Sequence, residues 1–235
     1  MEPDRPSTAN RYRRTLLALF GAGFLPGRLH AQPARGTPAC ILTPQQIEGP
    51  YFIDQRLNRS DIRFDPVRGQ AKTGAPLHLI LRISAVGDPG CTPLAGAVVD
   101  IWHCDAGGEY SAVEENRRNP EQSGFLRGYQ VTDANGEVRF TTIYPGAYPG
   151  RTVHIHVKVR TRSSSGRASE FTSQLYFDDG LTDRVYLQKA YADSRKARQK
   201  NSQDGLFQRG GRQLMLVLNE QDDGYRGSFD FGIRI

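Results

Sequence analysis

The sequence predicts an all-β protein, an antiparallel β-sandwich with long loops and at most one short helix. Eight short segments alternate between apolar and polar residues, or run apolar, over the length of a strand. Glycine (25 residues) and proline (14 residues) are abundant, which is typical of a fold with many turns. Only one segment has the apolar spacing of a helix, so strands dominate the prediction.

The predicted strands follow one another from residue 77 to the end of the chain. They cover residues 77–84, 96–103, 126–132, 137–143, 153–160, 172–177, 214–218 and 228–233. Short strands separated by turn residues favour two packed sheets around one core. A chain of 235 residues has room for one such domain. We therefore assign residues 77–235 to the sandwich and residues 32–76 to an N-terminal arm that packs on it.

One turn and one helix stand out between these strands. Residues 133–136 read Asp-Ala-Asn-Gly, and Asn-Gly supplies the left-handed conformations that a tight turn needs. We expect this turn to join strands 126–132 and 137–143 as an antiparallel hairpin. The single predicted helix covers residues 181–192, whose imperfect apolar face consists of Leu181, Val185, Leu187 and Tyr191.

Residues 1–31 have the pattern of a twin-arginine signal peptide. Arg13 and Arg14 precede an apolar run over residues 16–24, and Ala31 and Ala34 are candidate cleavage positions. We expect export to the periplasm or to the outside of the cell, by a route that carries folded proteins, often with a cofactor already bound. An ordinary secretory leader with a charged start is the alternative interpretation.

The charge of the chain does not favour a nucleic-acid partner. The net charge of +6 includes five arginines and two acidic residues of the leader; subtracting them from 31 basic and 25 acidic residues leaves 26 and 23, a charge of +3. A charge this small, spread along the chain, does not predict binding to a polyanion. Outside the leader no stretch approaches the roughly 18 apolar residues of a spanning helix, so we expect no membrane association of the mature protein.

The three cysteines, Cys40, Cys91 and Cys104, permit at most one internal disulfide. Cys91 and Cys104 stand near opposite ends of one predicted strand, too far apart to pair with each other. We therefore expect any bridge to join Cys40 to one of them.

A His-x-His pair lies in the predicted strand 153–160. Because side chains alternate between the faces of a strand, Val153, Ile155 and Val157 face one way while His154 and His156 face the other. Two imidazoles at this spacing can bind one metal ion. For a lone His-x-His motif, two polar-face histidines without a metal are the more common case, so its neighbours must decide.

Two tyrosines in rigid turns supply that context. Tyr148 lies in a Pro- and Gly-rich turn, residues 144–151, and Tyr110 follows the Gly-Gly turn that ends strand 96–103. A phenol is a poor ligand for a soft divalent ion, but it becomes a strong anionic donor when a trivalent ion displaces its proton. Two tyrosines and two histidines together therefore favour Fe(III) over zinc or copper.

At these residues the sequence resembles the intradiol ring-cleavage dioxygenases, the family of catechol 1,2-dioxygenase and protocatechuate 3,4-dioxygenase. The resemblance covers most of the mature chain, and its Pro-Gly-Ala-Tyr-Pro turn is closest to the protocatechuate branch. The matching segments are 48–51 (EGPY), 97–103 (AVVDIWH), 108–111 (GEYS), 145–149 (PGAYP), 151–156 (RTVHIH) and 172–177 (TSQLYF).

The resemblance implies a mononuclear ferric site with Tyr110 and His154 as equatorial ligands and Tyr148 and His156 as axial ligands. It also implies that a catechol-type aromatic diol binds as a chelating dianion, that Tyr148 leaves the metal and takes a substrate proton, and that O2 opens the ring to a cis,cis-muconate. The metal would act as a Lewis acid and template.

Three further residues match positions that face the substrate in this family. Arg151 corresponds to an arginine over the bound ring, where a planar cation stabilises developing negative charge. Gln174 matches a supporting position behind it, and Tyr51 is expected to line the substrate pocket. His103 and Cys104 are interpreted as structural because the four ligands are already assigned.

The resemblance leaves the substrate and the oligomeric state open. Catechol, protocatechuate, hydroxyquinol, chlorinated derivatives and larger plant phenols are all compatible with the motifs. The segment between the leader and residue 77 is too short and too rich in proline for the helical dimerisation region of the catechol branch. A monomer and a homo-oligomer are both compatible with the sequence.

Two other classes of protein compete with this interpretation. A cupin or a copper-zinc superoxide dismutase also uses His-x-His on a strand, but these need more ligands than His78 and His103 can add, and no glutamate closely follows His156. A transthyretin-like binding module without a metal is the second alternative. The presence of all four ligand residues argues against it.

Overall fold

The computed structural model describes residues 41–87, 90–114, 117–118, 123–163 and 165–235. The signal peptide predicted for residues 1–31, the first part of the predicted arm and Cys40 lie outside these ranges. Within them, no helix is both long and apolar enough to cross a membrane.

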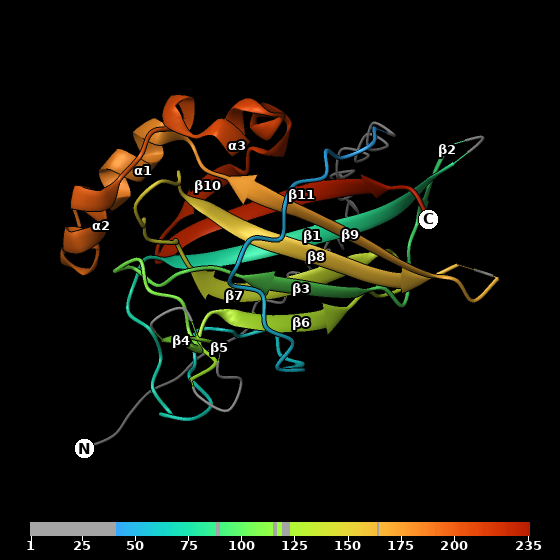
Figure 1. Cartoon of the computed structure of the whole chain (residues 1–235), viewed down its shortest axis with the longest axis horizontal. Coiled ribbons are helices and arrows are strands. Elements are labelled where there is room, and N and C mark those ends of the chain that lie inside the picture. Colours follow the sequence, from blue (N-terminus) through green and yellow to red (C-terminus); the bar gives the residue numbers. More distant parts are fainter. Residues whose placement is uncertain (1–40, 88–89, 115–116, 119–122, 164) are drawn as a thin grey trace, which may run out of the picture. The chain divides into compact units, whose positions relative to one another are not determined.

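The described chain forms two β-sheets that share one hydrophobic core (Figure 1). The first sheet has the strand order β10-β11-β1-β2, and β7 also pairs with β1. The second has the order β6-β3-β8-β9. Strand bounds in the first sheet are β1 Pro76–Gly87, β2 Gly90–Pro93, β7 Glu137–Ile143, β10 Val217–Gln221 and β11 Gly224–Ile233; in the second they are β3 Val98–Trp102, β6 Arg127–Val131, β8 His154–Arg162 and β9 Ala168–Tyr176.

The core forms because alternate residues of facing strands are apolar. Leu77, Leu79, Leu81 and Ile83 of β1 are buried on one face, while Ile155 and its alternate neighbours on β8 point to the same core. Alternation of this kind buries one face of each sheet and leaves the other for polar residues. The all-β sandwich predicted from the sequence is confirmed.

One pairing departs from the predicted antiparallel arrangement. β1 and β11 are parallel, with Leu77 opposite Tyr225 and Ile83 opposite Phe231. These are the first and the last strand of the domain in the sequence, so no short turn connects them and dictates their relative direction.

The hairpin predicted at residues 133–136 is wrong, although the turn itself is present. Gly136 has a φ of 71°, and Asp133 accepts hydrogen bonds from Asn135 and Glu137. However, β6 pairs with β3 and β7 pairs with β1, so the turn carries the chain from one sheet to the other. Asn-Gly chemistry specifies a local reversal, but packing selects the partner strand.

The expectation of at most one short helix is also wrong. Residues 181–192 contribute to α1 (Asp179–Val185), the 3-10 helix η1 (Lys189–Tyr191) and the first residue of α2 (Ala192–Ala197). The chain is extended at Gln188 (ψ 145°), and Leu187 of the predicted apolar face is 73% exposed. The buried residues of that face therefore lie in separate helices, Leu181 and Val185 in α1 and Tyr191 in η1. Further along lie η2 (Asn201–Gln203), α3 (Gly205–Gln208) and η3 (Gly211–Leu214).

Other boundaries differ by a few residues or were missed. The strand predicted at 214–218 begins later, as β10, because Leu214 ends η3. The sequence did not predict β2 or the small pair formed by β4 (Val113–Glu114) and β5 (Arg117–Arg118). Strands this short carry too few residues to show an alternating pattern.

Residues 44–58, here called the strap, cross the outer face of the second sheet (Figure 1). The Gln46 amide donates to Thr172 on β9 (2.9 Å), and Asn58 bridges to Tyr129 on β6. Between these ends, ion pairs tie Glu48 to Lys158 (2.8 Å) and Asp54 to Arg160 (3.0 Å). The strap thus covers the face on which the alternate residues of β8 project.

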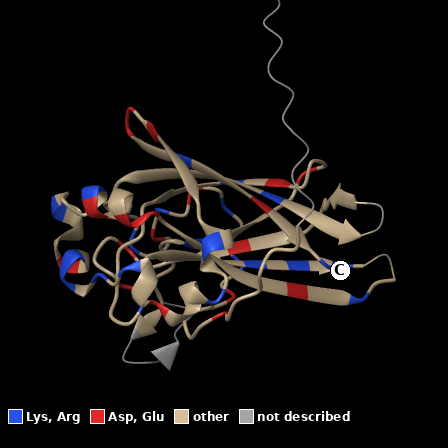
Figure 2. Cartoon of the chain, turned by 90° about the horizontal axis from the view of Figure 1, so that it is seen from above, with Lys and Arg blue, Asp and Glu red and all other residues tan. Residues whose placement is uncertain are grey.

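Basic and acidic residues are both scattered along the strands and helices (Figure 2). Cys91 is disulfide-bonded and Cys104 is a free, buried thiol. These two cysteines therefore do not pair with each other, as predicted.

Candidate metal centre

β8 places two histidines on the outer face of the second sheet. His154 and His156 are 2% and 1% exposed, and the alternate residues Val153, Ile155 and Val157 belong to the core between the sheets. The predicted alternation is therefore present. Burial of both imidazoles beneath the strap and the neighbouring loops removes them from solvent.

The two imidazoles are neutral and their Nε2 atoms face each other. The Nδ1 of His154 donates to the carbonyl oxygen of Thr152 (2.6 Å), which leaves a lone pair on Nε2. That Nε2 lies 3.1 Å from the Nε2 of His156. Burial lowers the pKa of His154 to about 3 and that of His156 well below its usual value. Neutral imidazole is the form that binds metal ions.

Tyr148 approaches the same point from the turn before β8. Its hydroxyl oxygen lies 3.2 Å from the Nε2 of His154. The turn is held from behind, because the Gly146 amide donates to the Asp105 carbonyl (3.0 Å) and the Ala147 amide donates to the hydroxyl of Ser194 (2.8 Å). The Pro- and Gly-rich sequence thus aims Tyr148 at the histidines.

Tyr110 lies beside Tyr148, with a ring-centroid distance of 5.6 Å, and its ring is 6.4 Å from that of His156. Its buried hydroxyl has no hydrogen-bond partner among the described residues. Burial raises the pKa of Tyr110 well above its usual value. A buried hydroxyl without a partner is costly, so this oxygen is suited to a ligand that the described residues do not supply.

The spacing of these donors fits a single metal ion. Two ligand atoms about 2.1 Å from one ion, at right angles to each other, are about 3.0 Å apart. The separations of 3.1 Å between the imidazole nitrogens and 3.2 Å to the Tyr148 hydroxyl are close to this value. Within the described ranges no group of three or more His, Cys, Asp or Glu side chains is arranged so that it could hold a metal ion. The donor set thus depends on phenol oxygens, which favour a trivalent ion such as Fe(III).

His156 is held between an aromatic ring and a close backbone. The indole of Trp102, on the neighbouring strand β3, stacks on the imidazole at 4.8 Å with an interplanar angle of 5°. Gly49 of the strap approaches the ring with a φ of +76°, and a Cβ there would lie 3.3 Å from its Cε1. Contacts of this kind determine the orientation of a ligand before any metal binds.

Arg151 extends a planar cation toward His154. Its Nη1 lies 3.4 Å from the Nε2 of His154, its Nη2 donates to Gln174 (2.5 Å), and its Nε donates to Asp204 (2.8 Å). Gln174 in turn donates to the Ile47 carbonyl of the strap (3.0 Å). The structure therefore brings Arg151 and Gln174, both predicted from the sequence, into direct contact beside the histidines.

Asp204 was missed by the sequence interpretation. Its carboxylate is 1% exposed, and one oxygen caps α3 through the amides of Leu206 and Phe207. The other oxygen accepts from Arg151 and from the Thr152 amide. An Asp before a short helix is a recognisable cap, but its contact with Arg151 spans 53 residues and has no local signal.

The loops that carry the two tyrosines are joined by small residues that the sequence interpretation also missed. Gly108 has a φ of +96°, and a Cβ there would lie 2.3 Å from the Ala147 carbonyl oxygen. The hydroxyl of Ser194, on α2, donates to the Ala106 carbonyl (2.7 Å) and accepts from the Ala147 amide (2.8 Å). The helical segment therefore helps to set the distance between the two tyrosines.

An open cavity of about 600 Å³ adjoins the tyrosines. Tyr51, Tyr110 and Tyr148 line it together with residues such as Lys72 and Phe125. Tyr51 stacks on Tyr110 at a centroid distance of 4.3 Å, so its predicted place beside a pocket is supported. A cavity of this size, next to a set of candidate metal ligands, can admit a small aromatic molecule.

His103 and Cys104 have partners elsewhere. The ring nitrogens of His103 contact the Cys104 carbonyl (2.8 Å) and the Thr142 hydroxyl (2.7 Å). The thiol of Cys104 donates to the Gly146 carbonyl (3.4 Å). Both residues therefore have the structural role expected from the sequence.

Comparisons with known proteins identify relatives of this chain. A family model described as "Dioxygenase" matches residues 47–205. The protocatechuate 3,4-dioxygenase beta chain of Burkholderia cepacia is 33% identical over 122 residues, which cover 48% of this chain and 51% of that relative. The chain spans about half the length of the first curated relatives it matches.

Two solved structures are similar over most of the described fold. An intradiol ring-cleavage dioxygenase from Tetranychus urticae is 32% identical, with a TM-score of 0.70, and the match covers 83% of this chain and 95% of that one. The dioxygenase domain of a dioxygenase carbohydrate-binding protein fusion from Streptomyces sp. SirexAA-E is 30% identical, with a TM-score of 0.60, covering 83% and 99%.

Proposed function

Because this chain belongs to the family of intradiol ring-cleavage dioxygenases, we propose that it is a non-haem Fe(III) dioxygenase. It would insert both atoms of O2 into a catechol-type ring and form a cis,cis-muconate-type dicarboxylic acid. One observation carries the proposal, namely that the Nε2 of His154 lies 3.1 Å from that of His156 and 3.2 Å from the Tyr148 hydroxyl. The ring of Tyr110, whose buried hydroxyl has no partner among the described residues, lies beside that of Tyr148.

The residues that would hold the iron are Tyr110, Tyr148, His154 and His156. When bound, ferric iron supplies a Lewis acid and a template for the two oxygens of the diol and for O2. The proposal is supported by the fit between donor spacing and metal-ligand geometry. It is also supported by the chemistry of the donors, since phenol oxygens favour a trivalent ion.

Tyr148 has a second role in the proposal, as the base for the substrate. Burial raises the pKa of its hydroxyl above the usual value, so the phenolate of Tyr148 is a stronger base than one exposed to water. Its oxygen can therefore take up a proton from a substrate hydroxyl. Its position at the cavity, with the hydroxyl 3.2 Å from the Nε2 of His154, supports this role.

Arg151 is proposed to stabilise negative charge that develops on the ring. Its guanidinium is oriented by Asp204 and Gln174 on two sides. Because these partners hold the cation in place before the reaction, little reorganisation is needed as the charge develops. Tyr51, which stacks on Tyr110 and lines the cavity, is proposed to contact the substrate ring together with Arg151 and Gln174.

We also propose that the protein is exported by the twin-arginine route, on the pattern of residues 1–31. Replacing Arg13 and Arg14 by lysine should keep the protein in the cytoplasm, as followed by cell fractionation. Export that is unchanged by this double substitution would favour the ordinary secretory leader.

The deciding experiment measures iron, colour and reaction together. Protein purified after iron loading should contain about one iron per chain and be wine-red from tyrosinate-to-iron charge transfer. It should consume O2 with a panel of catechols and give muconates that carry both atoms of isotopically labelled oxygen. Semialdehyde products would mean extradiol cleavage, and folded protein that stays colourless and iron-free would contradict the assignment.

A further inference from the structure

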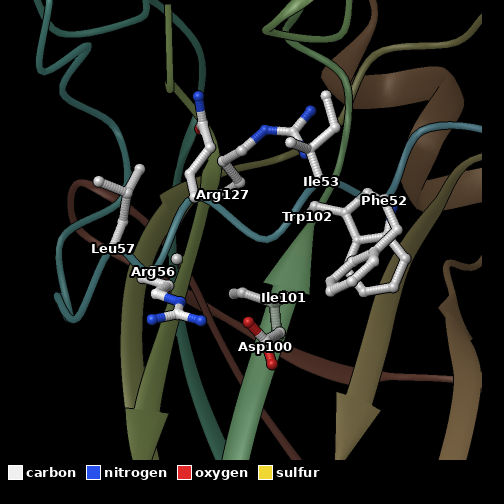
Figure 3. Close-up of a pocket in the computed structure, with 10 residues that line it drawn as sticks. Phe52, Ile53, Arg56, Leu57, Asp100, Ile101, Trp102 and Arg127 are labelled. Atoms are coloured by element: carbon white, nitrogen blue, oxygen red, sulfur yellow. The ribbon is translucent and has the colours of Figure 1, made fainter. Parts of the chain in front are cut away.

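Arg127, the first residue of β6, is a buried cation with no carboxylate partner among the described residues. The residue is 3% exposed. Its Nε donates to the Ser111 hydroxyl (2.7 Å), its Nη2 to the Ser111 carbonyl (2.7 Å) and its Nη1 to the Tyr51 carbonyl (3.0 Å). Asp100 lines the same small pocket but lies at its far end (Figure 3), and Asp100 pairs with Arg160 instead.

An arginine in this setting needs an explanation other than an ion pair. Burying a cation without an opposite charge is unfavourable. Burial lowers the pKa of Arg127 only to about 10, so the group stays charged at neutral pH. The three hydrogen bonds that the Arg127 side chain makes with the described residues all go to Ser111 and Tyr51. The positions of these two residues indicate the role of the side chain.

Both residues that Arg127 holds are neighbours of Tyr110. Ser111 follows Tyr110 in the chain, and the Ser111 hydroxyl, which accepts from Arg127, donates to the Phe125 carbonyl (2.7 Å). Tyr51 belongs to the strap, and its ring stacks on that of Tyr110 at 4.3 Å. The guanidinium therefore links the strap, at Tyr51, to the loop that carries Tyr110, at Ser111. Tyr110 adjoins both of these contacts, because it precedes Ser111 and its ring stacks on that of Tyr51.

The backbone on either side of this contact is strained. Ala112, directly after Ser111, has a φ of 57°, and Leu126, directly before Arg127, has a φ of 54°. Residues other than glycine adopt these values at a cost, and such strain persists where surrounding contacts enforce it. The three hydrogen bonds of Arg127 are contacts of this kind, because they link the two strained segments.

We infer that Arg127 is a positioning residue that fastens Ser111 and Tyr51 and so directs the Tyr110 hydroxyl toward the two imidazoles. The inference rests on the proposed function, since Tyr110 matters here as a ligand. A role limited to stability is the competing explanation. That explanation predicts no effect on the metal centre beyond what a comparable buried arginine would have.

Two substitutions and one control separate these explanations. Arg127→Met keeps the apolar stem and removes every donor, while Arg127→Lys keeps the charge but loses the fork that reaches both partners. Arg82→Met is the control, because the Arg82 side chain is 24% exposed and pairs with Glu137 (3.1 Å) and Asp230 (3.2 Å) on the first sheet. Neither of these ion pairs involves the helical segment or the residues Tyr51, Tyr110 and Ser111.

The primary measurement is the rate at which iron-loaded protein transfers iron to a competing chelator, together with the tyrosinate-to-iron absorption band. We expect iron loss to be at least tenfold faster and the band to shift in Arg127→Met, with a smaller effect in Arg127→Lys. Amide exchange of residues 108–113 in metal-free protein should also become faster. Arg82→Met should lower the unfolding temperature without changing iron loss, the band or exchange in this loop.

The inference is overturned if parent protein holds iron and both Arg127 variants keep its release rate within twofold and its band unchanged. If Arg127→Met does not fold, Arg127→Lys decides by the same criteria. A parent protein that binds no iron refutes the proposed function and the ligand role of Tyr110 with it. An unaltered metal centre in the variants refutes the role of Arg127 alone.

Discussion

The carboxylate of Asp204 lies 2.8 Å from the Nε of Arg151, and this buried pair links the helical segment to the candidate metal centre. Burial raises the pKa of Asp204, but hydrogen bonds from the Thr152 amide and from Arg151 outweigh it and hold the pKa below its usual value. Asp204 is therefore ionised at neutral pH. It orients Arg151 and caps α3 with the same carboxylate.

Asp204→Asn should impair catalysis more than folding. Asparagine is as good a helix cap as aspartate, so α3 should persist, but the ion pair with Arg151 is lost. We expect kcat/KM for a catechol to fall about 10- to 100-fold, because a misplaced cation no longer faces the ring. Asp178→Asn is the control, since Asp178 caps α1 in the same way without touching Arg151. Equal activity in the two variants would contradict this role.

Gly108→Ala should separate the two tyrosine loops. The added Cβ would meet the Ala147 carbonyl oxygen at 2.3 Å, a distance that forces the backbone to move. The loop of Tyr110 should shift away from that of Tyr148, with loss of most bound iron and a weaker charge-transfer band. Metal analysis and absorbance of the purified variant measure both effects.

Gly150→Ala provides the matched control for this substitution. Gly150 has a similar left-handed φ of +86°, but a Cβ there would have nothing within 4 Å. Both variants thus carry the cost of a left-handed alanine, about 1 kcal/mol, and only Gly108→Ala adds the clash. Comparable iron content in the two variants would show that the close approach is unimportant.

Tyr148→Phe should leave a folded protein with partly bleached colour and much slower turnover. The substitution removes the hydroxyl that lies 3.2 Å from His154, and with it one phenolate ligand and the proposed base. Loss of a positioned base lowers rates by roughly 100- to 10,000-fold. Tyr144→Phe removes another buried hydroxyl, bonded to Thr182 (2.7 Å), and should retain colour and kcat. A Tyr148→Phe enzyme with parental kcat would contradict the assignment.

His103 should make stability depend on pH. Burial lowers the pKa of His103 from 6.5 to about 4, so the folded state disfavours the proton that the unfolded chain accepts below 6.5. The contribution of neutral His103 to the free energy of unfolding is complete above the unfolded-state pKa of 6.5. It is lost as the pH falls through the folded-state pKa of about 4. The free energy of unfolding should therefore fall by up to about 3 kcal/mol over this window.

His103→Gln tests this pH dependence. Glutamine can keep a donor to the Cys104 carbonyl and an acceptor for the Thr142 hydroxyl, but it does not titrate. Urea unfolding at a series of pH values, with the metal content matched, should show a shallower acid slope for the variant. His154 and His156 act in the same direction in both proteins, so the difference reports His103. Parallel slopes would exclude this residue as the source.

The fold class could be predicted because it depends on local patterns. Alternation of apolar residues along β1 and β8 indicates the face that enters the core whatever the partner strand is. The partners themselves could not be predicted in this way. The turn at residues 133–136 suggested a hairpin, yet β6 and β7 belong to different sheets, because pairing is decided by which buried faces pack together.

The candidate site shows the same division. His154 and His156 share a face because they are two residues apart on one strand, and the stiff turn before them suggested the role of Tyr148. The contacts of Asp204, Ser194 and Arg127 with the site join residues 16 to 88 positions apart in the sequence. No local pattern marks such residues, since each is a common polar side chain in its own segment.

The sequence by itself indicated the β-sandwich, the alternation of β8 and four candidate donor side chains, through residue type, short-range spacing and the family motifs. Only the tertiary structure decided how far apart those donors lie and which residues orient them. Distances between donors depend on how loops and helices from distant parts of the chain pack against β8. Packing of that kind is a property of the folded chain as a whole.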